Sequence, residues 1–138
     1  MASRSELFKQ IRPTLKTPIN PNQSLAEESF QNLVLRPILK LQNELLISVL
    51  VNYFKKHKNS FYSLTLEKRL QYIAQAIQKD TKFRNSLKGM IIGCFSLEEY
   101  EVYTHHSSAL NKRMMGMLVE RYQSQIQLFE NPKSQEIS

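Results

Sequence analysis

Glycine and cysteine are scarce in this sequence, and each scarcity excludes a class of site. Only three glycines occur in 138 residues. None belongs to a G-x-G-x-x-G or Gly-Lys-Ser/Thr pattern, so no phosphate-binding loop is predicted. Cys94 is the single cysteine, which excludes an internal disulfide and a cysteine-cluster metal site. Its apolar neighbours predict a buried, inert thiol.

Long apolar runs are also missing. The most apolar stretch, Leu45 to Val51, is far shorter than the roughly 20 residues that cross a bilayer. The segment from Met1 to Lys16 is interrupted by charged residues and has no apolar core of a secretory signal. We therefore expect a cytoplasmic protein that does not enter a membrane.

Acidic residues are outnumbered, with 12 against 19 lysines and arginines, and the net charge of +7 is uneven. Residues 65–95 carry +4, whereas residues 96–138 carry −2. This asymmetry fits a nucleic-acid footprint, but it fits equally well an attraction between two helices or between two subunits.

Apolar residues recur at helical spacing along most of the chain, which predicts an all-α bundle of about four helices. Ser24 and Glu27 form an S-x-x-E capping box that opens a long first helix. Pro37 lies inside this helix and must kink it near Leu33 to Arg36 or start a new one. The expected core stripe is Phe30, Val34, Ile38, Leu41, Leu45, Val49 and Tyr53.

Two shorter helices and a long last helix follow. The second helix is expected to be capped at Ser63 or Thr65, and the third at Asp80. Gly93 is placed to end the third helix in a left-handed conformation. A second S-x-x-E box, Ser96 to Glu99, opens a last helix that we expect to be long and straight up to Phe129.

Three regions are predicted on this basis. Residues 1–23 contain three of the five prolines and form an extended, partly flexible N-terminal arm. Residues 24–130 form a single helical domain, and residues 131–138 a flexible tail. Apolar side chains could dock the arm onto the domain; they are Leu7, Phe8, Ile11 and Leu15.

Four charged residues interrupt or border the apolar stripes: Arg36, Glu44, Arg113 and Glu120. A buried charge has to be paired. These residues therefore either form ion pairs between the first and last helices or line a polar pocket between them. A pocket of this kind would suit a small-molecule enzyme.

A metal site is conceivable at the start of the last helix, where Glu98, Glu101 and His105 share one face. Helical metal proteins usually use Glu-x-x-His pairs from two helices, and this chain contains no such pair. An acidic first turn favoured by the helix dipole explains the glutamates. We predict no metal and no other cofactor.

The basic middle of the chain offers candidates for nucleic-acid contact: Lys68, Arg69, Lys82, Arg84 and Lys88. These residues make a DNA-binding helix-turn-helix motif a hypothesis to be tested. No glycine-containing tight turn joins the two helices, however, and the basic residues do not share one face. Nucleic-acid binding is therefore an alternative and not the favoured hypothesis.

The last helix carries Met114, Met115 and Met117, whose flexible side chains suit either core packing or a partner surface. A long amphipathic helix has two sides to bury. The favoured hypothesis is a non-enzymatic helical interaction module that binds a protein partner or another copy of itself as a homodimer.

Several short runs resemble a family of short bacterial all-helical proteins, some of which are called glyoxalases. The runs are Phe30-Gln31-Asn32, Leu35 to Lys40, Gly89 to Gly93 and Glu120-Arg121. The likeness covers roughly residues 28–128. It implies an all-helical fold and, from the name of those relatives, a small-molecule enzyme, but it supplies no catalytic residues for positions in this chain.

Overall fold

The protein is helical throughout the part of the chain that the structure describes. The computed structural model describes residues 2–13 and 23–129, with residues 23–25 described without side chains. No strand occurs in these ranges, so the all-α prediction is confirmed. The elements are α1 (Arg4–Ile11), α2 (Gln23–Phe30), the π-helix η1 (Gln31–Leu35), α3 (Arg36–Leu41), α4 (Asn43–Lys56), the 3-10 helix η2 (Ser60–Ser63), α5 (Leu66–Lys79), α6 (Thr81–Ile92), α7 (Leu97–His105), α8 (Ser107–Ser124) and the 3-10 helix η3 (Ile126–Leu128).

The predicted count of about four helices is wrong, because two of the four are broken. The first predicted helix comprises α2, η1, α3 and α4, and the last comprises α7 and α8. One break is at Gln42, where ψ is 3°, and the other is at His106, where φ is −135°. Neither residue is a proline or a glycine, so the usual helix-breaking signals were absent from the sequence.

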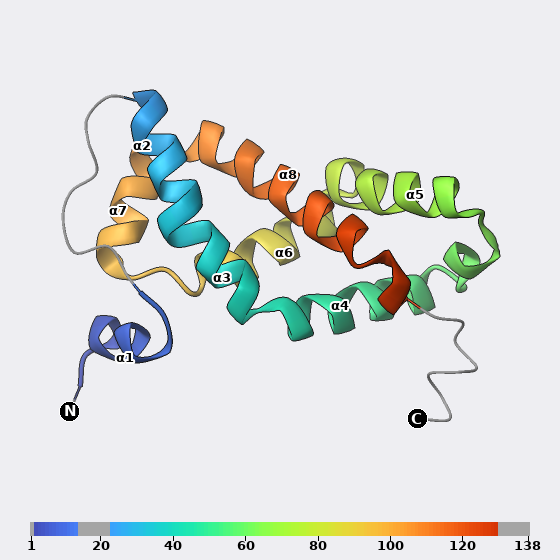
Figure 1. Cartoon of the computed structure of the whole chain (residues 1–138), viewed down its shortest axis with the longest axis horizontal. Coiled ribbons are helices and arrows are strands. Elements are labelled where there is room, and N and C mark those ends of the chain that lie inside the picture. The colour runs from blue at the N-terminus through green and yellow to red at the C-terminus, as the bar shows by residue number, and fades with distance from the viewer. Residues whose placement is uncertain (1, 14–22, 130–138) are drawn as a thin grey trace.

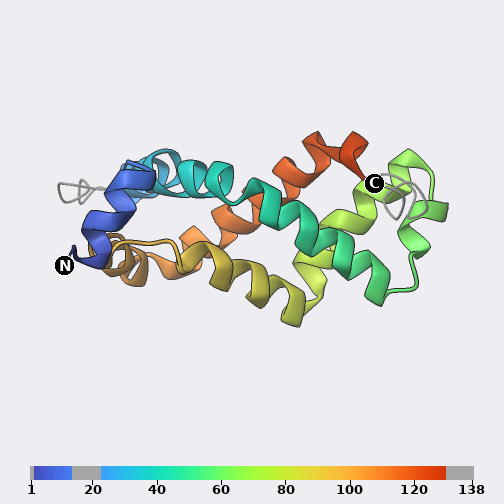
Figure 2. The ribbon, with the colours of Figure 1, turned by 90° about the horizontal axis from the view of Figure 1, so that it is seen from below.

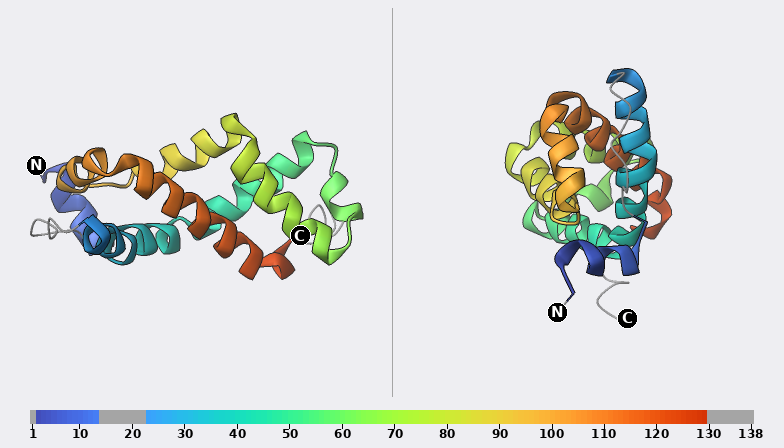
Figure 3. Two further views of the ribbon diagram at one scale, coloured as in Figure 1. Left: turned by 90° about the horizontal axis from the view of Figure 1, so that it is seen from above. Right: turned by 90° about the vertical axis from the view of Figure 1, so that its left-hand side faces the viewer.

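Helix α8 lies at the centre of the bundle. It contacts η1 on one side, α5 and α6 on another, and α7 at its start. Figures 1 and 2 show an elongated molecule in which α2, η1 and α3 run in one line and α4 turns away from that line. In Figure 3, α1 lies at one end of the bundle and the turn between α4 and α5 at the other.

The buried stripe of the first predicted helix differs from the expected one after Ile38. Leu41 and Leu45 are 42% and 49% exposed, so these core predictions are wrong. The buried residues continue instead in steps of four, as Phe30, Val34, Ile38, Leu46, Leu50 and Phe54. Gln42 occupies the missing step. Its side chain donates to the Met90 carbonyl. The π turn and the break at Gln42 keep the buried stripe of residues in steps of four facing inward.

The helix-start signals at three positions are confirmed. The Ser96 and Glu99 side chains make both bonds of a capping box, Thr65 accepts from Lys68 N, and Asp80 accepts from Phe83 N at 3.2 Å. Each satisfies an N–H group that the first turn leaves free. Helix α2 starts at Gln23, so Ser24 is inside its first turn; the side chain of Ser24 lies outside the described residues.

The predicted left-handed ending at Gly93 is wrong. Gly93 has φ −59° and ψ −16°, within the right-handed helical region. The chain leaves α6 through short-range bonds from Cys94 N to Ile91 O and from Phe95 N to Ile92 O. These bonds satisfy the terminal carbonyls, so no left-handed residue is needed.

The N-terminal arm contains more regular structure than predicted. Ser3 and Glu6 form a capping box, and α1 is a helix of eight residues, about two turns. The same S-x-x-E spacing as at Ser96 could have predicted this helix. Leu7 and Ile11 are both more than half exposed, so they contribute little to its docking, whereas Phe8 is partly buried and packs against the core. Leu15 and the rest of 14–22 lie outside the described residues.

Two arginines attach α1 to the loop between α6 and α7. Arg4 donates to the carbonyls of Gly93, at 2.7 Å, and Phe95. Arg12 is 4% exposed and donates to the Cys94 carbonyl at 2.7 Å. The arm therefore docks through hydrogen bonds to the backbone and through Phe8, the one predicted apolar side chain of its described part that packs against the core.

A buried ion pair completes this attachment. Both guanidinium nitrogens of Arg12 bond to the two carboxylate oxygens of Glu99, one of them at 3.0 Å. The Glu99 carboxylate also accepts from Ser96 N at 2.8 Å, and Glu99 is fully buried. The same residue thus caps α7 and neutralises an arginine 87 positions away.

Within residues 2–13 and 23–129 we find no helix that is both long and apolar enough to cross a membrane. The predicted tail at residues 131–138 lies outside the described part of the chain.

Candidate functional site

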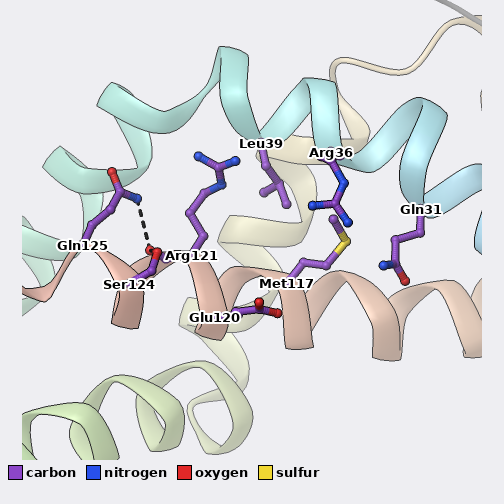
Figure 4. A pocket seen from close by; sticks show the side chains of 8 residues that line it. All are labelled: Gln31, Arg36, Leu39, Met117, Glu120, Arg121, Ser124 and Gln125. Atoms are coloured by element: carbon purple, nitrogen blue, oxygen red, sulfur yellow. Dashed lines mark hydrogen bonds between the residues drawn. The ribbon is translucent and has the colours of Figure 1, made fainter.

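A polar groove lies between η1 and α3 on one side and α8 on the other. Its volume is about 310 Å³. Figure 4 shows its lining, which comprises Gln31, Arg36, Leu39, Met117, Glu120, Arg121, Ser124 and Gln125. Six of these eight side chains are polar or charged. We call it the α3–α8 groove.

The π turn places two of the lining side chains on the same side of the helix. In an α-helix, residues five apart point about 140° away from each other, because each residue turns by about 100°. In η1, the N–H of Arg36 bonds to the carbonyl of Gln31 five residues earlier. The wider turn brings these two residues next to each other, and both line the groove. Single π turns are frequent at functional sites.

Pro37 explains where this turn occurs. Proline has no N–H, so a continuous α-helix would leave the Leu33 carbonyl without its bond. The helix changes its hydrogen bonding at Gln31–Leu35, immediately before Pro37, and Pro37 then lies in the first turn of α3. The predicted kink near Leu33 to Arg36 is wrong: the helix instead accommodates Pro37 with a π turn at Gln31–Leu35, and α2, η1 and α3 run in one line (Figures 1 and 2).

Three arginines in and beside the groove are oriented by neutral amide oxygens. Arg36 donates to Asn32 at 3.3 Å, Arg113 to Gln31 at 2.7 Å, and Arg121 to Asn43 at 3.2 Å. Asn43 also exchanges hydrogen bonds with Gln125, which donates in turn to the Arg121 carbonyl. An amide oxygen fixes the direction of a guanidinium but leaves its positive charge in place.

Two of these positive charges have no carboxylate partner in the described chain. Arg113 lies 3.8 Å from Glu27. Neither Arg36 nor Arg121 is within ion-pair distance of a described Asp or Glu. In Figure 4, the two guanidinium groups enter the space between α3 and α8 from opposite walls. Glu120 lines the same groove without pairing with either arginine.

The structure brings together part of the predicted polar pocket. Arg36 and Glu120 line the α3–α8 groove, and Arg113 is joined to it through Gln31. Glu44 is exposed on α4 and does not line the groove. The contributions of Gln31, Asn43 and Gln125 were missed, because isolated amide residues give no signal in a sequence.

The weak metal candidates at α7 do not form a cluster. The His105 ring nitrogen Nδ1 is 2.8 Å from the carbonyl of Glu101, in its own helix. Glu98 accepts a long bond from Ser5. No group of three His, Cys, Asp or Glu side chains suited to a metal ion occurs in the described residues.

The candidate basic residues separate into two kinds. Arg69 has an internal role, because it donates to the carbonyls of Tyr62 and Leu64 and lies over the Phe61 ring. Lys68 and Lys82 are exposed on different helices. Arg84 and Lys88 line a second groove, between α6 and α8.

A cluster at the junction of α4, α5 and α6 has a structural explanation. Tyr53 donates to Asp80 at 2.9 Å, and its ring packs on His57 and Phe83 with centroid distances of 4.1 Å. Burial raises the pKa of Tyr53, and hydrogen bonds from the Phe83 N–H and the Tyr53 hydroxyl lower the pKa of Asp80. Asp80 is already engaged as the α6 cap and by the Tyr53 hydroxyl, so its carboxylate has a structural role.

Cys94 is buried, as predicted. Burial raises the pKa of its thiol, despite the neighbouring Arg12. Gln42 donates to its sulfur at 3.3 Å. A thiol in this state is a poor nucleophile.

The expected partner surface on the last helix is also not found. Met114 is buried, and Met115 and Met117 are half-buried on opposite flanks of α8. No large exposed apolar side chain of the described chain lies on α6 or α8. Self-association stays a prediction, without an apolar surface on α8 to support it.

Comparisons with known proteins assign the chain to no family. No protein-family model matches the chain, and neither a curated protein nor a solved structure is significantly similar to it. The resemblance noted from short sequence runs stays a prediction, and the α3–α8 groove has to be interpreted from its own geometry.

Proposed function

We propose that this protein binds a small organic anion, with carboxylate or phosphate groups, in the α3–α8 groove. The observation that carries the proposal is that Arg36 and Arg121 enter the groove from opposite walls and that neither lies within ion-pair distance of a described carboxylate, including Glu120 of the same groove (Figure 4). Two positive charges in one groove repel each other, and an anion bound within reach of both would be attracted by both.

Guanidinium groups suit this role because they are planar and present several N–H donors in a fixed arrangement. Their bonds to Asn32 and Asn43 occupy only one donor each. The remaining donors can bind a carboxylate or phosphate in a bidentate manner. The amide partners reduce the motion of the guanidinium groups before binding, which lowers the entropy lost when a ligand is held.

The size of the groove fits a small ligand. Its volume of about 310 Å³ is at the lower end of the roughly 300 to 1,000 Å³ of ligand sites. Met117, which is half-buried, supplies an apolar surface for a short carbon skeleton. Glu120 and Ser124 add a carboxylate and a hydroxyl that could bind hydroxyl groups of the ligand.

The test is a titration followed by two-dimensional NMR, with inorganic phosphate and citrate as separate probes in a chloride buffer. We expect saturable shifts at the amides of η1, α3 and the end of α8, with a dissociation constant of about 1 mM or tighter for one of the probes. Replacement of either arginine, by Arg36→Gln or Arg121→Gln, should weaken binding at least tenfold.

A matched control is Lys40→Gln, which removes one positive charge from α3 outside the groove. It should leave the dissociation constant within about twofold. The variant Arg36→Lys keeps the charge but loses the planar donors, so it should be intermediate. Absence of saturable shifts with both probes, or an equal loss in Lys40→Gln, would overturn the proposal.

A further inference from the structure

A second groove lies on the opposite flank of α8, against α6. It is lined by Arg84, Asn85, Lys88, Ser108, Asn111, Lys112 and Met115, and its volume is about 320 Å³. At about 100° per residue, Ser108, Asn111, Lys112 and Met115 share one side of α8. Met117, Arg121 and Ser124 of the first groove share the other side. We call the second site the α6–α8 groove.

The charge in the α6–α8 groove is of one sign. Arg84 and Lys88 are one turn apart on α6, and Lys112 faces them from α8. No acidic residue lines this groove, and none occurs in α6 or in residues 107–119 of α8. None of the three cations has an ion-pair partner in the described chain. Arg84 is held by the Gln78 carbonyl at 2.8 Å, which leaves its charge uncompensated.

The groove extends beyond these three cations. A neighbouring depression shares Ser108 and Lys112 with it and continues to His105 and His106. No Asp or Glu lines this extension. The combined surface is therefore a continuous polar track that crosses from α6 to the start of α8, with asparagine and serine side chains between the cations.

The polar character of this track decides between classes of partner. Protein interfaces usually depend on apolar or aromatic anchors, and membrane-bound surfaces insert apolar side chains. The large exposed apolar side chains of the described chain lie on other elements, and none is on α6 or α8. Lys, Arg, Ser and Asn are the side chains that contact phosphates in nucleic-acid complexes.

We infer that the α6–α8 groove binds the phosphate backbone of a nucleic-acid duplex without reading its bases. No Phe, Tyr or Trp ring of the described residues lines the track, and its imidazoles, His105 and His106, lie only at one end of it, so the backbone and not unpaired bases is the favoured contact. The geometry also refines the expectation from the sequence. Of the five basic candidates, Arg84 and Lys88 belong to this surface, and Lys112, from the acidic last third of the chain, joins them.

The experiment measures binding of the full chain to a fluorescein-labelled 20-base-pair DNA duplex by anisotropy at several NaCl concentrations. Three phosphate contacts predict a slope of about −2.7 in log affinity against log salt, and a non-specific dissociation constant of about 1 to 100 µM. The triple variant Arg84→Gln/Lys88→Gln/Lys112→Gln should bind at least tenfold more weakly at 50 mM NaCl.

Two further variants keep the test decisive. The triple variant Lys40→Gln/Lys55→Gln/Lys56→Gln removes the same charge from exposed positions elsewhere and should retain most of the affinity. The double variant Lys88→Gln/Lys112→Gln leaves the Arg84 contact to Gln78 intact and should reduce the slope by about 1.8.

The inference is overturned if the duplex does not bind at 50 mM NaCl or if its affinity does not depend on the NaCl concentration. It is also overturned if the two triple variants lose affinity equally. Binding to phosphatidylserine vesicles in the absence of duplex binding would also overturn it. Phosphate or citrate binding in the α3–α8 groove should be unchanged in the Lys88→Gln/Lys112→Gln variant, so the two proposals can fail separately.

Discussion

Arginine is used in two contrasting ways in this molecule. Arg12 is buried and meets the carboxylate of Glu99, whereas Arg36 and Arg121 line an open groove and meet only amide oxygens. In the first case the partner neutralises the charge, and in the second it only orients the side chain. Among these three arginines, the carboxylate partner goes with burial in the fold, and the amide partners leave the charge available to a ligand.

The comparison predicts its largest effect at Glu99. Glu99→Gln keeps the shape of the side chain but leaves the Arg12 charge buried without a counter-charge. We expect a loss of about 3–5 kcal/mol in the free energy of unfolding, because an uncompensated buried charge is strongly destabilising. Urea denaturation followed by circular dichroism measures it.

The neighbouring variant Glu98→Gln is the control, because Glu98 is exposed. It should change stability by less than about 0.5 kcal/mol. Equal, small losses in both variants would show that the Arg12–Glu99 pair does not hold the arm.

The next largest effect concerns the buried hydroxyl of Tyr122, which should make the free energy of unfolding depend on pH in alkaline solution. Tyr122 donates to the Leu46 carbonyl at 2.6 Å, and burial raises its pKa well above the usual 10. The folded state therefore favours the neutral phenol, a contribution that is complete below pH 10 and is lost as pH rises further. Stability should fall by up to about 1.4 kcal/mol per pH unit above 10 from this group.

Tyr122→Phe removes the titrating group, so its unfolding free energy should decline less between pH 10 and 11 than that of the wild type. Guanidinium denaturation at pH 8, 10 and 11 gives the comparison. Parallel declines in the two proteins would contradict the assignment to Tyr122.

A substitution of Asn43 tests whether the orientation of the Arg121 side chain affects anion binding in the α3–α8 groove. Asn43→Ala removes the acceptor that holds Arg121 and Gln125 without changing any charge. We expect anion binding in the α3–α8 groove to weaken by about three- to tenfold, because a freer guanidinium loses more entropy on binding. Asn52→Ala, at an exposed position of the same helix, should have no effect on the NMR titration.

The smallest effect is expected from replacing the groove arginines, measured on the free energy of unfolding. Arg36→Gln and Arg121→Gln should each change the free energy of unfolding by less than about 0.5 kcal/mol, since neither charge is paired. A small gain in stability would also fit, because like charges would be removed. A loss of more than 2 kcal/mol would place these arginines with Arg12 as structural residues.

Local signals predicted local features of the fold well. The caps at Thr65, Asp80 and Ser96 depend on residues within four positions of one another. Pro37 indicated an interruption of the helix but not its form, which is a π turn and not the predicted kink. The breaks at Gln42 and His106 were not predicted, because tertiary packing and not a local breaker sets them. A helix that continued through Gln42 would have placed Leu41 and Leu45 in the core.

The candidate site was predicted only in part for the same reason. Arg36 and Glu120 could be recognised because they interrupt apolar stripes, but the asparagine and glutamine partners of the arginines follow no periodic pattern. The Arg12–Glu99 pair joins residues 87 positions apart. No spacing rule relates two charges at that separation, and Glu99 was already explained as a helix cap.

The attachment of α1 also has a consequence for the order of folding. An isolated helix of eight residues is not stable in water, and α1 buries none of its own residues. Its binding surface is the loop after α6 and the start of α7, so α1 must wait until the chain has been synthesised through Glu99. Docking of the arm is then a late step that slows unfolding more than it speeds folding. Helix α1, which is synthesised before the other described helices, is therefore among the last of them to dock.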